Sequence, residues 1–134
     1  FFNVKVRNQK MYKYNDKNPL NKRYQGMIYE TQALHLLESK GYQILERNYH
    51  CRAGEIDIIA LDDKYLVFVE VKFRTNDIMG HPLEAVTREK QKHMIYTANY
   101  YLIKHPEYLE NDIRFDVIGI LGEQITHLEH AFDL

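Results

Sequence analysis

Two apolar runs separated by three charged residues constrain the fold of this chain more than any other feature. The first run covers residues 55–61 and the second covers residues 65–73, and Asp62-Asp63-Lys64 lies between them as a predicted turn. The two runs therefore predict a β-hairpin. The second run is apolar on both faces through Val69, which favours a central buried strand over an edge strand.

The remaining elements are predicted from helical periodicity and capping residues. Residues 25–39 are predicted to form a helix that ends at Gly41, a position that favours a left-handed cap. Thr87 is predicted to cap a second helix that runs to Lys104. Three further strands are expected at residues 42–49, 113–121 and 125–132. The order of helix, three strands, helix and two strands predicts an α/β fold, specifically an α+β mixed sheet flanked by helices.

The length and the cysteine content limit the class of protein. A chain of 134 residues suits one domain. The single cysteine, Cys51, excludes an intramolecular disulfide and a cysteine-based zinc site. No apolar run approaches the roughly 18 residues of a membrane span, so we expect no membrane partner and a cytoplasmic location.

The formal net charge of -1 conceals an asymmetry. Residues 1–23 carry seven Lys and Arg against one acid, a net charge of +6, so residues 24–134 carry a net charge of -7. We expect a flexible basic N-terminal arm at 1–23 and a single domain at 24–134. The arm has two interpretations: it binds nucleic-acid phosphates while Tyr12, Tyr14 and Tyr24 stack on bases, or it is a solvated leader. The near-neutral total excludes a polycationic nucleic-acid coat.

Two acids and a lysine interrupt the most strand-like part of the sequence. Asp57 is set among isoleucines, and Glu70 and Lys72 are two residues apart, so their side chains leave the same strand face about 6–7 Å apart. A buried charge costs several kcal/mol unless it is paired or bound to a metal. Two carboxylates from adjacent strands predict a site for Mg²⁺ or Mn²⁺, with the lysine placed to orient a water or to stabilise phosphate charge.

Polar residues on the apolar faces of both predicted helices support this interpretation. Glu30 falls on the arc of Met27, Ala33, Leu34 and Leu37. Gln91 falls on the stripe of Met94, Ile95, Ala98 and Leu102, with Lys90 at its border. Each feature alone is also typical of a surface pair or a boundary residue. Solubility alone does not readily explain why all five polar residues occupy core-like positions: Glu30, Asp57, Glu70, Lys72 and Gln91.

The sequence 54-Gly-Glu-Ile-Asp-57 followed by 69-Val-Glu-Val-Lys-72 resembles the catalytic core of the PD-(D/E)XK nuclease superfamily. More closely, the chain resembles the YraN family, which is regarded as related to Holliday-junction resolvases. The similarity covers about 95 residues. It includes Gln25-Gly26, Glu46-Arg47-Asn48 and the segment from Arg114 to Ile118.

This resemblance implies a restriction-endonuclease-like core and a role for each matching residue. Asp57 and Glu70 would be the metal ligands, Lys72 the catalytic lysine, and Glu30 the first-helix acid that supports the metal site. Gln91, with Lys90 beside it, would occupy the later helix position that often supports the active site. For Asp116 we expect a structural pairing with a strand neighbour.

The arginines near the proposed site have two interpretations that the sequence does not separate. They either hold phosphates on both sides of the scissile bond or act as surface solubilisers. The candidate nucleic-acid-binding residues are Arg47, Arg52, Arg74, Arg88 and Lys90. The sequence thus predicts a metal-dependent endonuclease acting on nucleic acid, with DNA favoured over RNA and with branched DNA and a homodimer as options. The alternatives are a non-catalytic nucleic-acid-binding module of the same fold and a domain that binds another partner.

Overall fold

The computed structural model describes residues 19–134. Residues 1–18 of the predicted basic arm, which include Tyr12 and Tyr14, lie outside this range, whereas Tyr24 lies inside it. Within it, the predicted order of two helices and five strands is confirmed. The elements are α1 (Pro19–Ser39), β1 (Gln43–Cys51), β2 (Gly54–Asp62), β3 (Tyr65–Arg74), η1 (Pro82–Ala85), α2 (Arg88–Lys104), η2 (Pro106–Tyr108), β4 (Asp112–Leu121) and β5 (Gln124–Phe132).

Two of the predicted helix boundaries are confirmed by their capping geometry. Gly41 follows α1 at a φ of 86°, a left-handed conformation that glycine adopts without a steric penalty. The Thr87 hydroxyl accepts a hydrogen bond of 3.2 Å from the backbone N–H of Lys90, which caps α2. The start of α1 was predicted too late, because Pro19 begins the helix and not Gln25. Lys22 and Arg23, assigned above to the arm, therefore lie in α1.

The strands form one mixed sheet in the order β1-β2-β3-β4-β5. β3 lies at the centre, as predicted, and pairs antiparallel with β2 and parallel with β4. A parallel connection needs a crossover, and the segment containing η1 and α2 provides it. The fold is thus α+β, and in the described sheet only β3 and β4 form a parallel pair.

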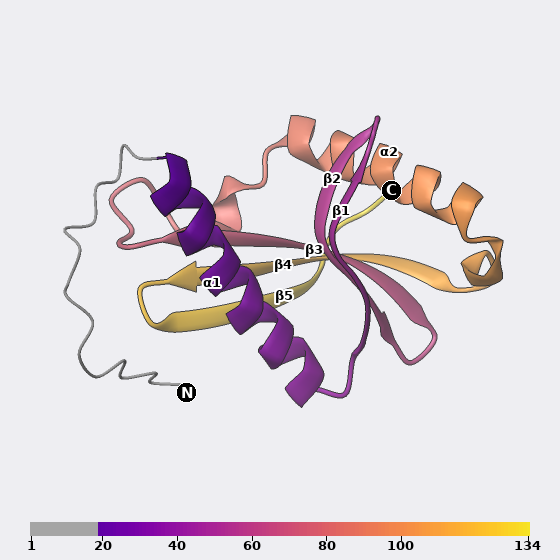
Figure 1. Cartoon of the computed structure of the whole chain (residues 1–134), viewed down its shortest axis with the longest axis horizontal. Helices are drawn as coiled ribbons and strands as arrows, with labels where there is room; N and C mark the ends of the chain where they lie inside the picture. Colours follow the sequence, from indigo (N-terminus) through magenta and orange to yellow (C-terminus); the bar gives the residue numbers. More distant parts are fainter. Residues whose placement is uncertain (1–18) are drawn as a thin grey trace.

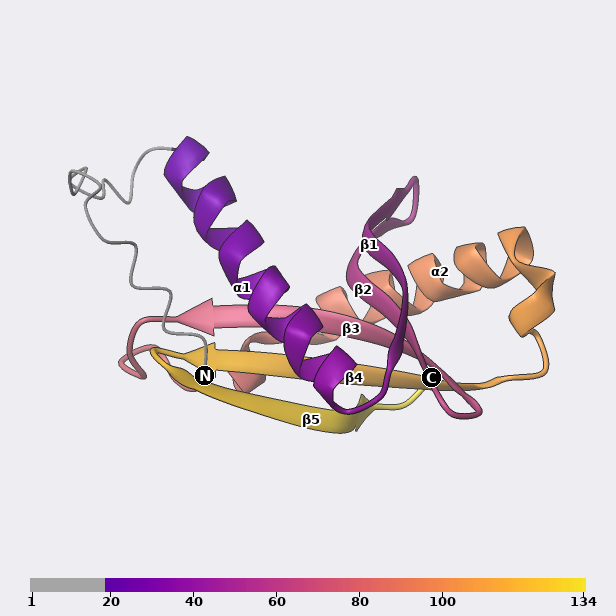
Figure 2. The ribbon, with the colours of Figure 1, turned by 60° about the horizontal axis from the view of Figure 1, so that its bottom comes forward.

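β2 and β3 separate part of the way along their length, which creates a fork. Their pairing runs from Asp62 and Tyr65 to Ile58 and Val69. Beyond this point β2 stays paired with β1 as far as Gly54, while β3 stays paired with β4 as far as Arg74. The β1–β2 hairpin consequently rises away from the sheet, as Figures 1 and 2 show.

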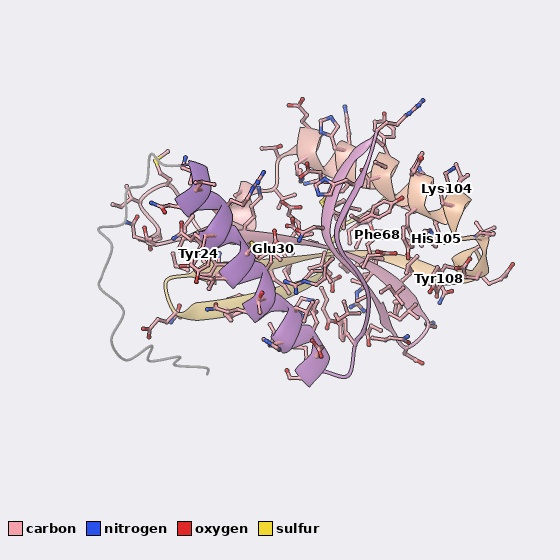
Figure 3. The ribbon with its side chains drawn as sticks, viewed as in Figure 1. Tyr24, Glu30, Phe68, Lys104, His105 and Tyr108 are labelled. Carbon is pink, nitrogen blue, oxygen red and sulfur yellow. The ribbon has the colours of Figure 1, made fainter. Side chains whose placement is uncertain are left out.

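Each helix covers one face of the sheet. The C-terminal half of α1 buries Ala33, Leu34 and Leu37 against a core that includes Ile58, Val67, Val69, Ile118 and Ile120. α2 buries Met94, Ala98 and Tyr101 against Phe68 and Phe115 on the other face. Figure 3 shows the aromatic end of this second core, where Phe68, His105 and Tyr108 are labelled. The ring of Tyr101 stacks on that of His105 with centroids 4.0 Å apart. Met27, placed on the apolar arc above, is 55% exposed because the N-terminal half of α1 extends past the core.

A group of buried charged side chains surrounds Asp116, on the face of the sheet that α1 covers. The carboxylate of Asp116 is fully buried and accepts hydrogen bonds from Arg114 Nε and Nη2, both at 2.9 Å, and from His127 Nε2 at 2.7 Å. The backbone N–H of His130 donates a further hydrogen bond of 3.0 Å. Burial by itself would raise the pKa of Asp116, but these bonds outweigh it and hold the pKa below its ordinary value. The structural pairing expected for Asp116 is confirmed.

Replacing Asp116 by alanine removes the main partner of the buried Arg114 guanidinium, so we expect a large loss of stability. The free energy of unfolding in urea should fall by about 3–5 kcal/mol at pH 7. Because the folded-state pKa is lowered, this contribution is present above the ordinary pKa of 3.8 and is lost as the pH falls through the folded-state value.

The control is Asp112→Ala, in which an exposed ion pair with Lys64 at 3.5 Å is removed from the same strand. It should cost at most about 1 kcal/mol. Equal losses in the two variants would contradict the structural role assigned to Asp116.

Candidate active site at the fork between β2 and β3

Asp57 and Glu70 lie where the two strands separate. They are the next residues on β2 and β3 beyond the paired Ile58 and Val69. In place of a ladder bond, the backbone N–H of Val71 donates to Asp57 Oδ2 at 2.8 Å. The sequence prediction that these two carboxylates come from adjacent strands is thus confirmed, and both line a common cavity.

Two lysines approach the buried carboxylate of Glu70 from different elements. Lys72 Nζ lies 3.5 Å from Glu70 Oε1, and Lys90 Nζ of α2 lies 3.5 Å from Oε2. The Glu70 side chain is 6% exposed, whereas the Lys72 and Lys90 side chains are 33% and 29% exposed. Within residues 19–134 Glu70 Oε2 has no hydrogen-bond partner. This oxygen therefore has an ion-pair partner, Lys90, but still has the capacity to accept a hydrogen bond or to bind a cation.

The two acids share one charge environment. Burial and the neighbouring Asp57 raise the pKa of Glu70 from 4.5 to about 7, against the opposing effect of Lys90 and Lys72. Burial also raises the pKa of Asp57, although the N–H of Val71 and both lysines act in the other direction. Perturbed carboxyl groups in a cavity are typical of a functional site, because bulk stability does not require them.

A cavity of about 220 Å³ lies beside these acids and is walled on one side by α1. The residues of α1 that line it share one helix face, since they are three or four positions apart: Lys22, Gln25, Gly26, Tyr29 and Glu30. Asp57, Glu70, Val71 and Phe73 form the other wall. The Tyr29 ring stacks on Phe73 with centroids 3.5 Å apart. This contact joins α1 to the end of β3 next to the site.

Glu30 is the third acid of the cavity. It projects from α1 toward the β1–β2 hairpin (Figure 3). Partial burial and the charge of Asp57 raise the pKa of Glu30, while a hydrogen bond from Asn48 and the charge of Arg47 act to lower it. The structure therefore brings together Glu30, Asp57, Glu70, Lys72 and Lys90.

The donor set fits a hard divalent cation bound mainly through water. Within residues 19–134 no group of three or more His, Cys, Asp or Glu is arranged to hold a metal. Mg²⁺ usually keeps several waters and takes one or two protein carboxylates. Asp57 and Glu70 match that requirement, and Glu70 Oε2, which is ion-paired with Lys90 at 3.5 Å, accepts no hydrogen bond among the described residues.

The other predicted site residues have different surroundings. The Gln91 amide donates to the backbone carbonyl of Val86 at 3.2 Å, so the α2 side chain that contacts Glu70 is Lys90. Arg47 donates to Thr31 Oγ1 at 3.1 Å, and Arg74 binds the carbonyls of Met79 and Gly80. Arg52, in the turn of the β1–β2 hairpin, and Arg88, the first residue of α2, are exposed. The nucleic-acid contacts of these residues remain predictions.

The α1 wall of the cavity was not predicted, although Gln25, Tyr29 and Glu30 all lie within the predicted helix. Lys22 was placed in the basic arm, because the helix was predicted to start at Gln25. Proline is common at the first helical position, and Pro19 marked the true start. The proximity of Asn48 to Glu30 was not predicted either, because it depends on the left-handed backbone conformation of Asn48.

Replacing Glu70 by glutamine should stabilise the metal-free protein at high pH. Because the folded-state pKa of about 7 exceeds the ordinary value of 4.5, the wild type loses stability as the pH rises between these values. In EDTA, Glu70→Gln should raise the free energy of unfolding by roughly 1–3 kcal/mol at pH 8 and by much less at pH 4.5.

The matched control is Glu55→Gln, which alters an exposed acid paired with His50 on the hairpin. Its stability should follow that of the wild type at both pH values. A Glu70→Gln variant with no gain at pH 8 would contradict the charge burial inferred at the fork.

Comparison with known proteins identifies relatives over most of the chain. Residues 29–120 match the family described as "Uncharacterised protein family UPF0102". A UPF0102 protein of Lachnoclostridium phytofermentans is 49% identical over 114 residues, which cover 85% of this chain and 97% of that protein. One from Chlorobium phaeobacteroides is 53% identical over 98 residues, covering 73% of this chain and 77% of the relative.

A third relative, from a Sulfurihydrogenibium species, is 42% identical over 115 residues, covering 86% of this chain and 99% of the relative. Among the helices of residues 19–134, none has the length and apolar character needed to cross a membrane. The matched segment contains Glu30, Asp57, Glu70, Lys72 and Lys90, the residues that the structure gathers at the fork. The chain belongs to the UPF0102 family, the YraN-type family that its sequence resembled.

Proposed function

We propose that this protein is a Mg²⁺- or Mn²⁺-dependent endonuclease with a restriction-endonuclease-like core. One observation carries the proposal: two carboxylates meet at a strand fork, a lysine lies 3.5 Å from each oxygen of the buried Glu70, and Glu70 Oε2 accepts no hydrogen bond among the described residues. A buried oxygen without a hydrogen bond costs about 1–3 kcal/mol, and the ion pair with Lys90 at 3.5 Å offsets part of that cost. A divalent cation bound by Glu70 and Asp57 would supply the missing interaction.

Each residue at the fork has a distinct role in this proposal. Asp57 and Glu70 would hold the metal, which would supply an activated water and neutralise phosphate charge. Lys72, whose amine lies 3.5 Å from Glu70 and whose side chain is one-third exposed, would stabilise charge that develops on the scissile phosphate. Glu30 keeps a third negative charge next to Asp57 and so strengthens the attraction for a cation.

The proposed substrate is nucleic acid, with DNA favoured over RNA. The acidic fork is compatible with a phosphodiester because the bound metal, and not the protein's net charge, offsets the phosphate. Arg52 and Arg88 lie at the turn of the hairpin and at the start of α2, on two elements next to the fork, and both are exposed to solvent. Phosphate contacts of this kind position the substrate without reading its sequence.

The proposal predicts phosphodiester cleavage that requires Mg²⁺ or Mn²⁺ and stops in EDTA. Asp57→Ala should abolish it, and Lys72→Ala should reduce the rate by about 100-fold or more, because a charge-stabilising group is lost. Labelled four-way junction, flap, duplex and single-stranded DNA, together with an RNA duplex, should be incubated with each protein and the products resolved on denaturing gels.

Lys64→Ala, in the exposed turn between β2 and β3, is the matched control and should cleave like the wild type. Thermal unfolding should confirm that every variant is folded. Robust cleavage by both purified site variants would refute the catalytic assignment. Binding of labelled DNA without cleavage under every metal condition would favour the non-catalytic binding module.

A further inference from the structure

The conformation of Asn48 stands out within β1. Its φ is 49°, a left-handed value inside a β-strand. Asparagine tolerates this region better than most residues, yet the conformation still interrupts the strand. Arg47 pairs with Ile58 and Tyr49 pairs with Ile56 on β2, so Asn48 lies opposite Asp57. The irregularity in β1 therefore faces the residue at which β2 leaves β3.

The contacts of this segment all lead to one turn of α1. The Asn48 side chain is a hydrogen-bonding neighbour that lowers the pKa of Glu30, and Arg47 lowers it through its charge. Arg47 also donates a hydrogen bond of 3.1 Å to the neighbouring Thr31. β1 thus contacts α1 at two consecutive residues. An ordinary strand alternates its side chains between faces, so two neighbours on a regular strand would not both reach α1.

We propose that Asn48 is a positioning residue for the active site, and that its left-handed backbone turns its amide toward Glu30 and holds this acid beside Asp57. This inference rests on the proposed function, because Asn48 can affect metal binding only if Asp57 and Glu70 hold a metal that Glu30 helps to attract. Partners of this outer kind set the geometry of a metal site without touching the metal.

Glycine offers a clean test because it adopts the left-handed conformation without strain and removes only the side chain. Asn48→Gly should keep the fold but weaken Mn²⁺ binding, measured by isothermal titration calorimetry, roughly tenfold or more. Glu30→Gln should weaken it to a similar extent. The double variant should be no weaker than Glu30→Gln alone, since Asn48 acts through Glu30.

Asp63→Gly is the matched control, because Asp63 also has a left-handed φ, 52°, but is exposed in the turn between β2 and β3. It should bind Mn²⁺ like the wild type. Wild-type affinity in Asn48→Gly, or losses that multiply in the double variant, would overturn the positioning role.

A second measurement separates this inference from the proposed function. If the wild type binds no Mn²⁺, the metal site fails, but the contact is still testable in the metal-free protein. The effects of Asn48→Gly and Glu30→Gln on urea unfolding should then be non-additive, because the two residues share one hydrogen bond. Additive effects would show that Asn48 does not hold Glu30.

Discussion

The separation of β2 from β3 is the constraint on which the site depends. β3 must follow β4 in a parallel pair, while β2 must follow β1 in a hairpin, and the two directions diverge after Ile58 and Val69. A gap in a sheet exposes backbone groups that need partners. The Asp57 carboxylate provides one such partner, because it accepts a hydrogen bond from the backbone N–H of Val71. The site therefore occupies a place where the sheet cannot complete its own hydrogen bonding.

The parallel pairing of β3 and β4 also explains how both helices reach this gap. The crossover between the two strands carries α2 over one face of the sheet, which brings Lys90 in its first turn to Glu70. α1 covers the opposite face and presents the partly buried Glu30 from near its midpoint. Because the strands part here, side chains from both faces can meet. An uninterrupted sheet would keep them apart.

The elements and the acidic residues of the site were predictable from the sequence, because apolar periodicity and buried charges are properties of the chain itself. Asp57, Glu70 and Lys72 stood out as charges within strands, and the order of the elements along the chain followed from the apolar runs. The contact of Lys90 with Glu70 was not predictable, since it depends on how α2 is rotated over the sheet. The proximity of Asn48 to Glu30 depends on a left-handed backbone angle, and the place of Lys22 in the α1 wall depends on the helix start at Pro19.

Two buried acids of the sheet, Asp116 and Glu70, differ in their hydrogen bonding and in the direction of their pKa shifts. Asp116 receives four hydrogen bonds and has a lowered pKa, so its charge is fully compensated within the protein. Glu70 has a raised pKa, and its Oε2 accepts no hydrogen bond among the described residues. Lys72 Nζ lies 3.5 Å from Oε1, and Lys90 Nζ lies 3.5 Å from Oε2. A chain that satisfies one buried carboxylate completely is able to satisfy the other. Leaving Glu70 incomplete therefore favours an external ligand, and a cation is the partner that two neighbouring carboxylates attract most strongly.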